Sequence, residues 1–112
     1  MDRLTFFQNT IVAILEDNAA YYKGTTNPLN LLILEDRKRN HFQLLMQGWD
    51  NEQYIFQCLF HLDIINDKIW IQWNDTDFPI EEELLKCGVL KDEIVIGVKH
   101  PNVRNITDFA IA

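Results

Sequence analysis

Apolar residues near the start of the chain recur every three or four positions, a spacing typical of an amphipathic helix. The stripe consists of Leu4, Phe7, Ile11, Ile14, Leu15, Ala19 and Tyr22. This pattern predicts a first helix over residues 4–22. Asp2 is placed to cap its first amides, and Lys23 followed by Gly24 is a sequence that commonly ends a helix. We expect a loop at residues 25–28.

The period of the apolar positions then shortens from 3.6 toward 2, which indicates strands. Four strands are expected at residues 29–34, 41–48, 53–65 and 68–73. Short polar turns should separate them at residues 35–40, 49–52 and 66–67. Because linkers this short cannot carry a parallel crossover, the four strands should form an antiparallel meander.

A second helix is predicted at residues 79–87, where Pro79 suits the first turn and Gly88 the stop. A fifth strand at residues 93–98 could then run parallel to the fourth. A short helical turn is expected at residues 103–108, before an apolar tail at 109–112. The predicted fold is α+β: an N-terminal helix packed on a mixed, mainly antiparallel sheet of about five strands, with a second helix before the last strand. We expect one domain over residues 1–112.

Composition and charge narrow the class of protein. Of the 112 residues, 47% are apolar and 24% charged, as in ordinary globular domains. Ten Lys and Arg against 17 Asp and Glu give a net charge of −7, which disfavours strong direct binding to nucleic acid. No uncharged run is long enough for a membrane span, and no secretory signal is visible. Cys58 and Cys87 are therefore expected to be reduced thiols of a cytoplasmic protein.

His61 and Asp63 are the strongest candidates for chemistry. They lie two apart on a predicted strand and so share a face, with Gln57 expected further along it. An imidazole beside a carboxylate can act in catalysis, but the sequence has no nucleophile elbow, which favours a polar pair or a contact surface. His41 and His100 do not complete a metal-ligand spacing. We predict no catalytic, cofactor-binding or metal-binding residue.

Two charged clusters admit a functional interpretation. The acidic run from Asp75 has Ile80 where a calcium loop needs glycine, and Lys86 where it needs glutamate, which favours a charged helix start. The basic run at residues 37–39 could contact a phosphate. Its acidic neighbours, Glu35 and Asp36, favour a solvated turn instead.

The three tryptophans, Trp49, Trp70 and Trp73, fall in the predicted sheet. Strict alternation would place Trp70 and Gln72 on one face of the fourth strand and Trp73 on the other. Both faces would then carry large apolar groups, whereas two helices can cover only one of them. Part of the second face is therefore expected to be a protein interface, although the tryptophans could instead fill a single core.

A series of short motifs in the second part of the chain resembles a known family. They are HFQLLM at 41–46, GW at 48–49, HLDII at 61–65, KIWIQ at 68–72, DT at 75–76, ELL at 83–85, GV at 88–89, KDEIV at 91–95, HP at 100–101, VR at 103–104 and TDFA at 107–110. In this order they resemble the XisI family of fdxN element excision controlling factors. The motifs span about two thirds of the chain, and the first predicted helix agrees with the family's N-terminal part.

The resemblance implies a small α+β protein of cyanobacteria that acts with a companion, XisH, in the controlled excision of a DNA element during heterocyst differentiation. The recombinase is a separate protein, so the resemblance implies an accessory factor and not an enzyme. A regulatory or inhibitory module paired with a nuclease-like partner, without a role in excision, is the alternative. We expect contacts with an XisH-like protein, and a possible homodimer, to use a surface formed by Trp49, His61, Asp63, Trp70, Trp73 and Phe109.

Overall fold

The structure, a computed structural model, describes residues 2–25 and 29–112. Within these ranges the chain forms two α-helices, five strands and two short 3-10 helices. In chain order they are α1 (Arg3–Thr25), β1 (Asn30–Asp36), β2 (His41–Asp50), β3 (Gln53–Ile65), β4 (Lys68–Asn74), α2 (Ile80–Lys86), η1 (Lys91–Glu93), β5 (Ile94–Val95) and η2 (Pro101–Ile106).

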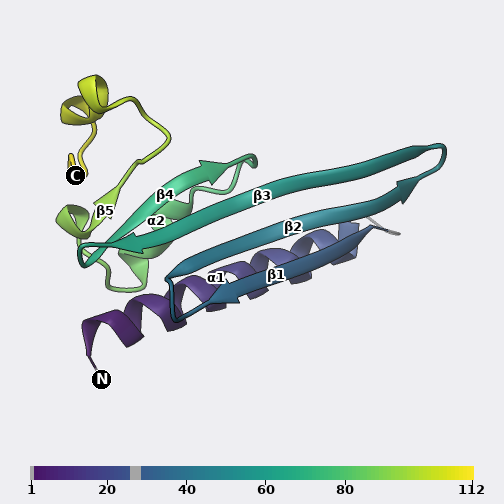
Figure 1. Cartoon of the computed structure of the whole chain (residues 1–112), viewed down its shortest axis with the longest axis horizontal. Coiled ribbons are helices and arrows are strands. Elements are labelled where there is room, and N and C mark those ends of the chain that lie inside the picture. The colour runs from purple at the N-terminus through teal and green to yellow at the C-terminus, as the bar shows by residue number, and fades with distance from the viewer. Residues whose placement is uncertain (1, 26–28) are drawn as a thin grey trace.

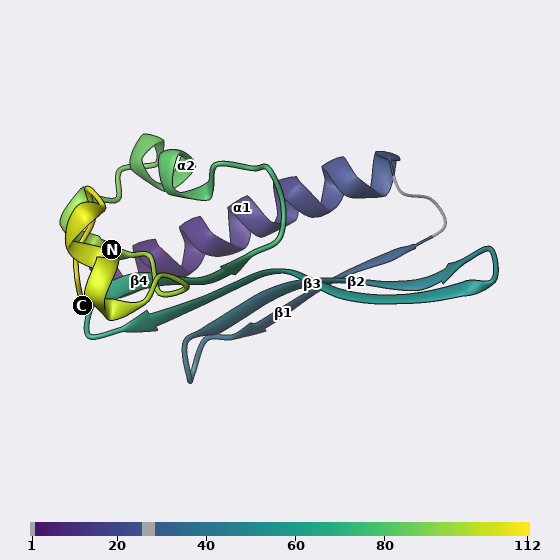
Figure 2. The ribbon, with the colours of Figure 1, turned by 90° about the horizontal axis from the view of Figure 1, so that it is seen from above.

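The five strands form one sheet in the order β1-β2-β3-β4-β5 (Figure 1). The first four pair antiparallel, and β5 pairs parallel to β4. Both α-helices lie on the same face of this sheet, as the view from above shows (Figure 2). The predicted α+β architecture, with its mixed sheet and second helix before the last strand, is confirmed.

The first helix is also confirmed, with its cap. The Asp2 carboxylate accepts a hydrogen bond from the Thr5 amide at 2.7 Å, which satisfies one of the unpaired donors of the first turn. The helix extends to Thr25, past the predicted end, so Gly24 is helical and does not act as a stop. The rest of the predicted loop, residues 26–28, lies outside the described residues.

The hairpins are longer than the pattern predicted. β1 continues through Glu35 and Asp36, and β2 continues through Trp49 and Asp50, which leaves turns at only 37–40 and 51–52. The tight turns are made by residues that tolerate the left-handed region, such as Asn51 with φ of 58°. The limits of β3 and the turn at 66–67 agree with the prediction, and β4 is one residue longer.

The fifth strand is much shorter than predicted. It comprises only Ile94 and Val95, because Glu93 belongs to η1 and the chain leaves the sheet at Ile96. The C-terminal tail occupies the far edge of β5, where the Ala110 amide donates to the Ile94 carbonyl at 2.8 Å.

The second helix follows Pro79 and stops before Gly88, whose φ of +105° is one that glycine adopts readily. The helical turn predicted at 103–108 is η2, which begins earlier, at Pro101.

The hydrophobic core fills the space between the two helices and the sheet. Its largest fully buried side chains are Phe7, Phe42, Phe60, Ile11, Leu15, Leu44, Leu62, Ile69, Ile80, Leu84, Ile94 and Val89. The tryptophans do not belong to it, because Trp49 and Trp73 are exposed and Trp70 is half-buried. Neither α-helix in the described part of the chain has the length and apolar character that a membrane crossing requires.

An ion pair between Arg3 and Glu93 ties the start of α1 to the connection before β5. The Arg3 guanidinium donates to both oxygens of the Glu93 carboxylate, and it also donates to the Gly88 carbonyl at 3.0 Å. These hydrogen bonds from Arg3 lower the pKa of Glu93 below its ordinary value of 4.5. A carboxylate with a lowered pKa in the folded state stabilises the fold above the unfolded pKa, and this contribution is lost as the pH falls through the folded value.

Replacing Glu93 by Gln should therefore reduce stability at neutral pH and have little effect in acid. We expect the urea midpoint of E93Q to fall by roughly a few tenths of a molar at pH 7, since solvent screens the half-exposed Arg3. The difference should shrink as the pH falls below the ordinary value of 4.5 and vanish once the pH lies below the lowered pKa of the folded state, where the wild-type carboxyl is protonated. The exposed Glu82 on α2 supplies the control, E82Q. A gap between E93Q and wild type that persists in acid would contradict the charge-based explanation.

Candidate functional site

The face of the sheet opposite the helices carries a group of exposed apolar side chains. Leu31 and Ile33 of β1 pack on the core, so Leu32 and Leu34 point to the opposite face. Residues paired across strands share a face, which extends the group over β2 and β3. We call this group the open-face patch: Leu34, Trp49, Tyr54 and Phe56, which are exposed, together with the half-buried Leu32.

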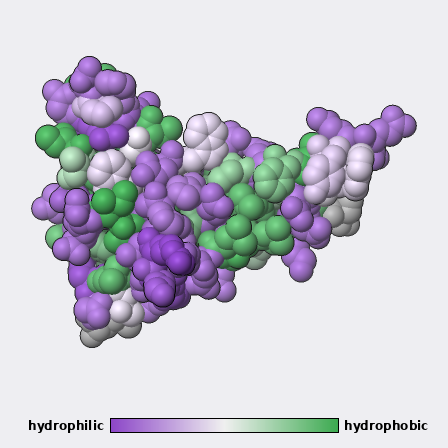
Figure 3. Space-filling model, viewed as in Figure 1, coloured by the Kyte–Doolittle hydropathy of each residue, from purple (hydrophilic) through white to green (hydrophobic). Residues whose placement is uncertain are grey.

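Four members of the open-face patch are unusually accessible for their size. Phe56 is 66% exposed, Trp49 61%, Tyr54 51% and Leu34 49%. Trp49 and Tyr54 pack edge to face, with ring centroids 5.2 Å apart. Figure 3, which looks onto this face, shows the apolar surface in green in the middle of the molecule, and white and purple surface toward the end of the β2–β3 hairpin. Contiguous apolar surface of this kind usually marks a contact site.

Two irregularities in strand pairing change which side chains share this face. The register of β2 and β3 shifts between Leu44 and Leu45, so Gln57 pairs with the core-facing Met46 and is not on the face of His61. The register of β3 and β4 shifts beside His61, which places Trp73 opposite His61 on the open face. The predicted positions of Gln57 and Trp73 were therefore wrong, because strict alternation does not hold across a β-bulge.

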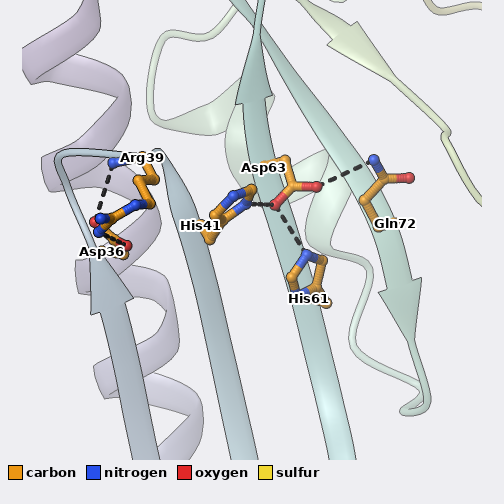
Figure 4. A network of polar contacts seen from close by, with 6 residues as sticks. All are labelled: Asp36, Arg39, His41, His61, Asp63 and Gln72. Carbon is orange, nitrogen blue, oxygen red and sulfur yellow. Dashed lines mark hydrogen bonds and ion pairs between the residues drawn. The ribbon is translucent and has the colours of Figure 1, made fainter.

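A cluster of two histidines and one aspartate lies on the same face, toward the β2–β1 turn. Asp63 Oδ1 is 2.7 Å from His41 Nδ1 and 2.9 Å from His61 Nε2 (Figure 4). The predicted proximity of His61 and Asp63 is confirmed, and the pairing of His41 with Asp63 across β2 and β3 adds the third member. The Asp63 side chain is only 11% exposed, whereas His61 is 26% and His41 54% exposed.

The second oxygen of Asp63 is held from the other side. The Gln72 amide donates to Asp63 Oδ2 at 3.2 Å, so this carboxylate receives polar contacts from β2, β3 and β4. Asp36, which pairs with His41 across β1 and β2, points instead to Arg39 (Figure 4). Hydrogen bonds from Arg39 lower the pKa of the Asp36 carboxyl. The cluster thus consists of the imidazoles of His41 and His61, both in contact with the Asp63 carboxylate, which Gln72 holds in place.

The remaining predicted interface residues are less accessible. Trp70 is half-buried beneath the guanidinium of Arg104, which lies 5.0 Å from its ring centroid. Phe109 packs against the core. Trp73 is 46% exposed, and its indole donates to the Cys58 carbonyl at 3.0 Å. The structure therefore leaves Trp49 and Trp73 as the exposed tryptophans of the predicted surface and places Trp70 and Phe109 beneath other groups.

The other candidates lie apart from the cluster. His100 caps η2 by accepting a hydrogen bond from the Asn102 amide. In the basic run, Arg37 pairs with Glu35 and Arg39 with Asp36, as expected of a solvated turn.

Both cysteines are free thiols; Cys58 is half-buried and Cys87 is exposed at the end of α2. Burial raises the pKa of both thiols, which disfavours the reactive thiolate form.

These features define a class of protein: a small α+β domain whose sheet is covered by helices on one face and presents an apolar patch and a polar cluster on the other. The family model of the XisI protein matches residues 1–111. The chain belongs to the XisI family. No curated protein matches it.

Solved structures agree with this assignment. A XisI-like protein from Anabaena variabilis ATCC 29413 is similar to the chain with 33% sequence identity and a TM-score of 0.90, covering 97% of this chain and 99% of its own. The fdxN element excision controlling factor XisI from the same organism shows 32% identity and a TM-score of 0.82, covering 99% of this chain and 100% of its own.

Proposed function

We propose that this chain is a controlling factor for excision of a DNA element and that it acts in the cytoplasm by docking its open sheet face on an XisH-like companion protein. Membership of the XisI family supports the general role, because a similar protein is named an excision controlling factor. The observation that carries the docking mechanism is the open-face patch. The proposal assigns the chain no catalytic step.

The open-face patch has the composition of a protein interface. Trp, Tyr and Phe are enriched among residues that dominate binding energy, since they bury a large area with few rotatable bonds. The patch contains Trp49, Tyr54 and Phe56, all more than half exposed. A protein that covered it would remove these groups from water.

Charge favours a basic partner. The chain carries a net charge of −7, and the tip of the β2–β3 hairpin adds Asp50 and Glu52 beside the patch. A protein that itself binds DNA needs a positive surface. Complementary charge would speed encounter with such a partner and fix its orientation. An acidic accessory factor can thus approach DNA through its companion without binding DNA itself.

The docking proposal predicts that a charge in the open-face patch abolishes the complex. The chain should be produced together with the XisH-like protein of its source organism, and the affinity measured by titration calorimetry. L34D and F56D should each weaken binding at least tenfold, because a carboxylate would be buried against an apolar partner surface. The matched control is L90D, since Leu90 is 58% exposed in the connection after α2, away from the patch. Equal affinity of L34D, F56D and wild type would refute docking through this face.

The alternative role, a module that restrains a nuclease-like partner without acting in excision, uses the same surface. Deletion of the gene, with excision scored by amplification across the element, separates the two roles. Loss of controlled excision supports the proposed function, and unchanged excision supports the alternative. If light scattering instead shows a stable homodimer that L34D and F56D dissociate, the patch serves self-association.

A further inference from the structure

We propose that His41, His61 and Asp63 form a binding site for one divalent transition-metal ion, with Zn²⁺ as the expected ion. The donor atoms of these residues, one from each side chain, all lie within 4.8 Å of one another. Two imidazole nitrogens with one carboxylate oxygen are a ligand set that Zn²⁺, Co²⁺ and Ni²⁺ favour. The inference does not depend on the docking proposal.

The geometry fits such an ion after small side-chain rotations. A tetrahedral Zn²⁺ with bonds of about 2.0–2.1 Å holds its ligand atoms about 3.3 Å apart. Here Asp63 Oδ1 lies 2.7 Å from His41 Nδ1 and 2.9 Å from His61 Nε2. Adjustments of roughly an ångström would therefore suffice. The strands supply a rigid base, since His41 of β2 pairs directly with Asp63 of β3 and Gln43 with His61.

The surroundings of Asp63 also suit a ligand. Gln72 holds Oδ2, which fixes the carboxylate plane and leaves Oδ1 toward the two histidines. The carboxylate is nearly buried, so its charge is screened little and an ion there would be attracted strongly. His41 is 54% exposed, which leaves the remaining coordination positions open to water or to a group of another protein.

Metal binding would exchange the hydrogen bonds to Asp63 for coordination and would move the proton of each ring to its other nitrogen. Without metal, both rings can donate to Asp63 Oδ1. With metal, the neutral rings place their protons on the other nitrogens, which are His41 Nε2 and His61 Nδ1. His61 Nδ1 is buried without a hydrogen-bond partner among the described residues, and it would have none in either state. This atom changes from an unpaired acceptor to an unpaired N–H donor when the metal binds, so the affinity should be lower than for a histidine whose second nitrogen has an acceptor.

The sequence could not show the whole site, because His41 becomes a neighbour of His61 and Asp63 only through strand pairing. His41 and His61 are 20 positions apart, and the third histidine, His100, lies at η2. The signal that could have found the site is a histidine opposite an aspartate in a long hairpin. To recognise that signal one must know which residues of β2 and β3 lie opposite each other, and a bulge shifts this pairing by one residue.

The test is titration calorimetry of chelator-treated protein with Zn²⁺, repeated with Co²⁺ and followed by its visible absorption. Wild type should bind one ion per chain and melt at a higher temperature with Zn²⁺, since an ion that binds only the folded state stabilises it. H41A, H61A and D63N should each bind at least tenfold more weakly and lose the thermal shift. H41Q keeps the proposal testable if another variant fails to fold, because His41 is exposed and its replacement should disturb the core least.

Two control variants separate this site from adventitious binding. H100A removes the histidine outside the cluster, and C87S removes the exposed thiol, another group that could hold Zn²⁺. Both should bind the ion as wild type does. The proposal is overturned if wild type binds no ion, if H61A and D63N bind it unchanged, or if binding is lost in H100A or C87S. Each of these results is independent of whether a partner protein docks on the open face.

Discussion

Phe60→Ala is expected to destabilise the fold by about 3–5 kcal/mol, the range for a large aromatic residue removed from a well-packed core. Phe60 is 0% exposed at the centre of β3, where it lies between Leu44 of β2 and Asn74 of β4. Its ring also packs edge to face on Phe78, with centroids 6.3 Å apart. Removing it leaves a cavity that the close-packed neighbouring side chains can fill only in part. A loss of this size is a large fraction of the total stability of a small domain.

The same strand supplies a matched control. Phe56 lies four residues earlier on β3 and is 66% exposed on the open face. Phe56→Ala should therefore change the free energy of unfolding by no more than about 0.5 kcal/mol. Urea unfolding followed by circular dichroism measures both. Phe60→Leu, which keeps most of the buried volume, should fall between them and remain folded if Phe60→Ala does not. Equal losses at positions 56 and 60 would contradict the assignment of the two faces.

The elements were predictable from sequence because their signals are local. The stripe of α1, the limits of β3 and the stop at Gly88 each depend on residues close together in the chain. The fifth strand was predicted too long for a reason that is not local. Residues 96–98 are as apolar as a strand requires, but the C-terminal tail pairs with Val95 and the chain leaves β4. A contact made by a distant segment thus overrode the local pattern.

The candidate site was only partly predictable, and one extra residue explains why. The two-residue turn at 51–52 pairs Asp50 with Gln53, and counting back from it would pair His41 with the core residue Leu62. The extra residue of β3 at the Leu44/Leu45 register shift moves this pairing by one, so His41 lies opposite Asp63 instead. His61 and Asp63 could be found because they lie on the same strand beyond the shift. His41 could not, since sequence periodicity does not show where a bulge falls.

The C-terminal segment is expected to loosen when Arg104 is replaced, because this side chain ties three carbonyls of the segment together and lies over Trp70. The Arg104 guanidinium donates to the Lys99 carbonyl at 3.0 Å, the Gly97 carbonyl at 3.2 Å and the Ile111 carbonyl at 3.5 Å. It also lies 5.0 Å from the ring centroid of Trp70. Hydrogen bonds from a charged donor together with a cation–π contact are worth about 2–3 kcal/mol when lost.

Arg104→Ala should therefore open residues 97–111 locally without unfolding the core. The amides of Val98 and Ala110, which bond to Ile71 and Ile94, should exchange with deuterium about 30- to 150-fold faster, the ratio that 2–3 kcal/mol represents. Arg104→Lys keeps the charge over Trp70 but cannot make the same set of hydrogen bonds, so its exchange rates should be intermediate. Arg39→Ala is the control, since Arg39 bonds to Asp36 on the hairpin tip. Unchanged protection of Ala110 in Arg104→Ala would mean that the strand pairing alone anchors the tail. Accelerated exchange would instead identify Trp70 as surface that this segment covers and that a partner could reach only by displacing it.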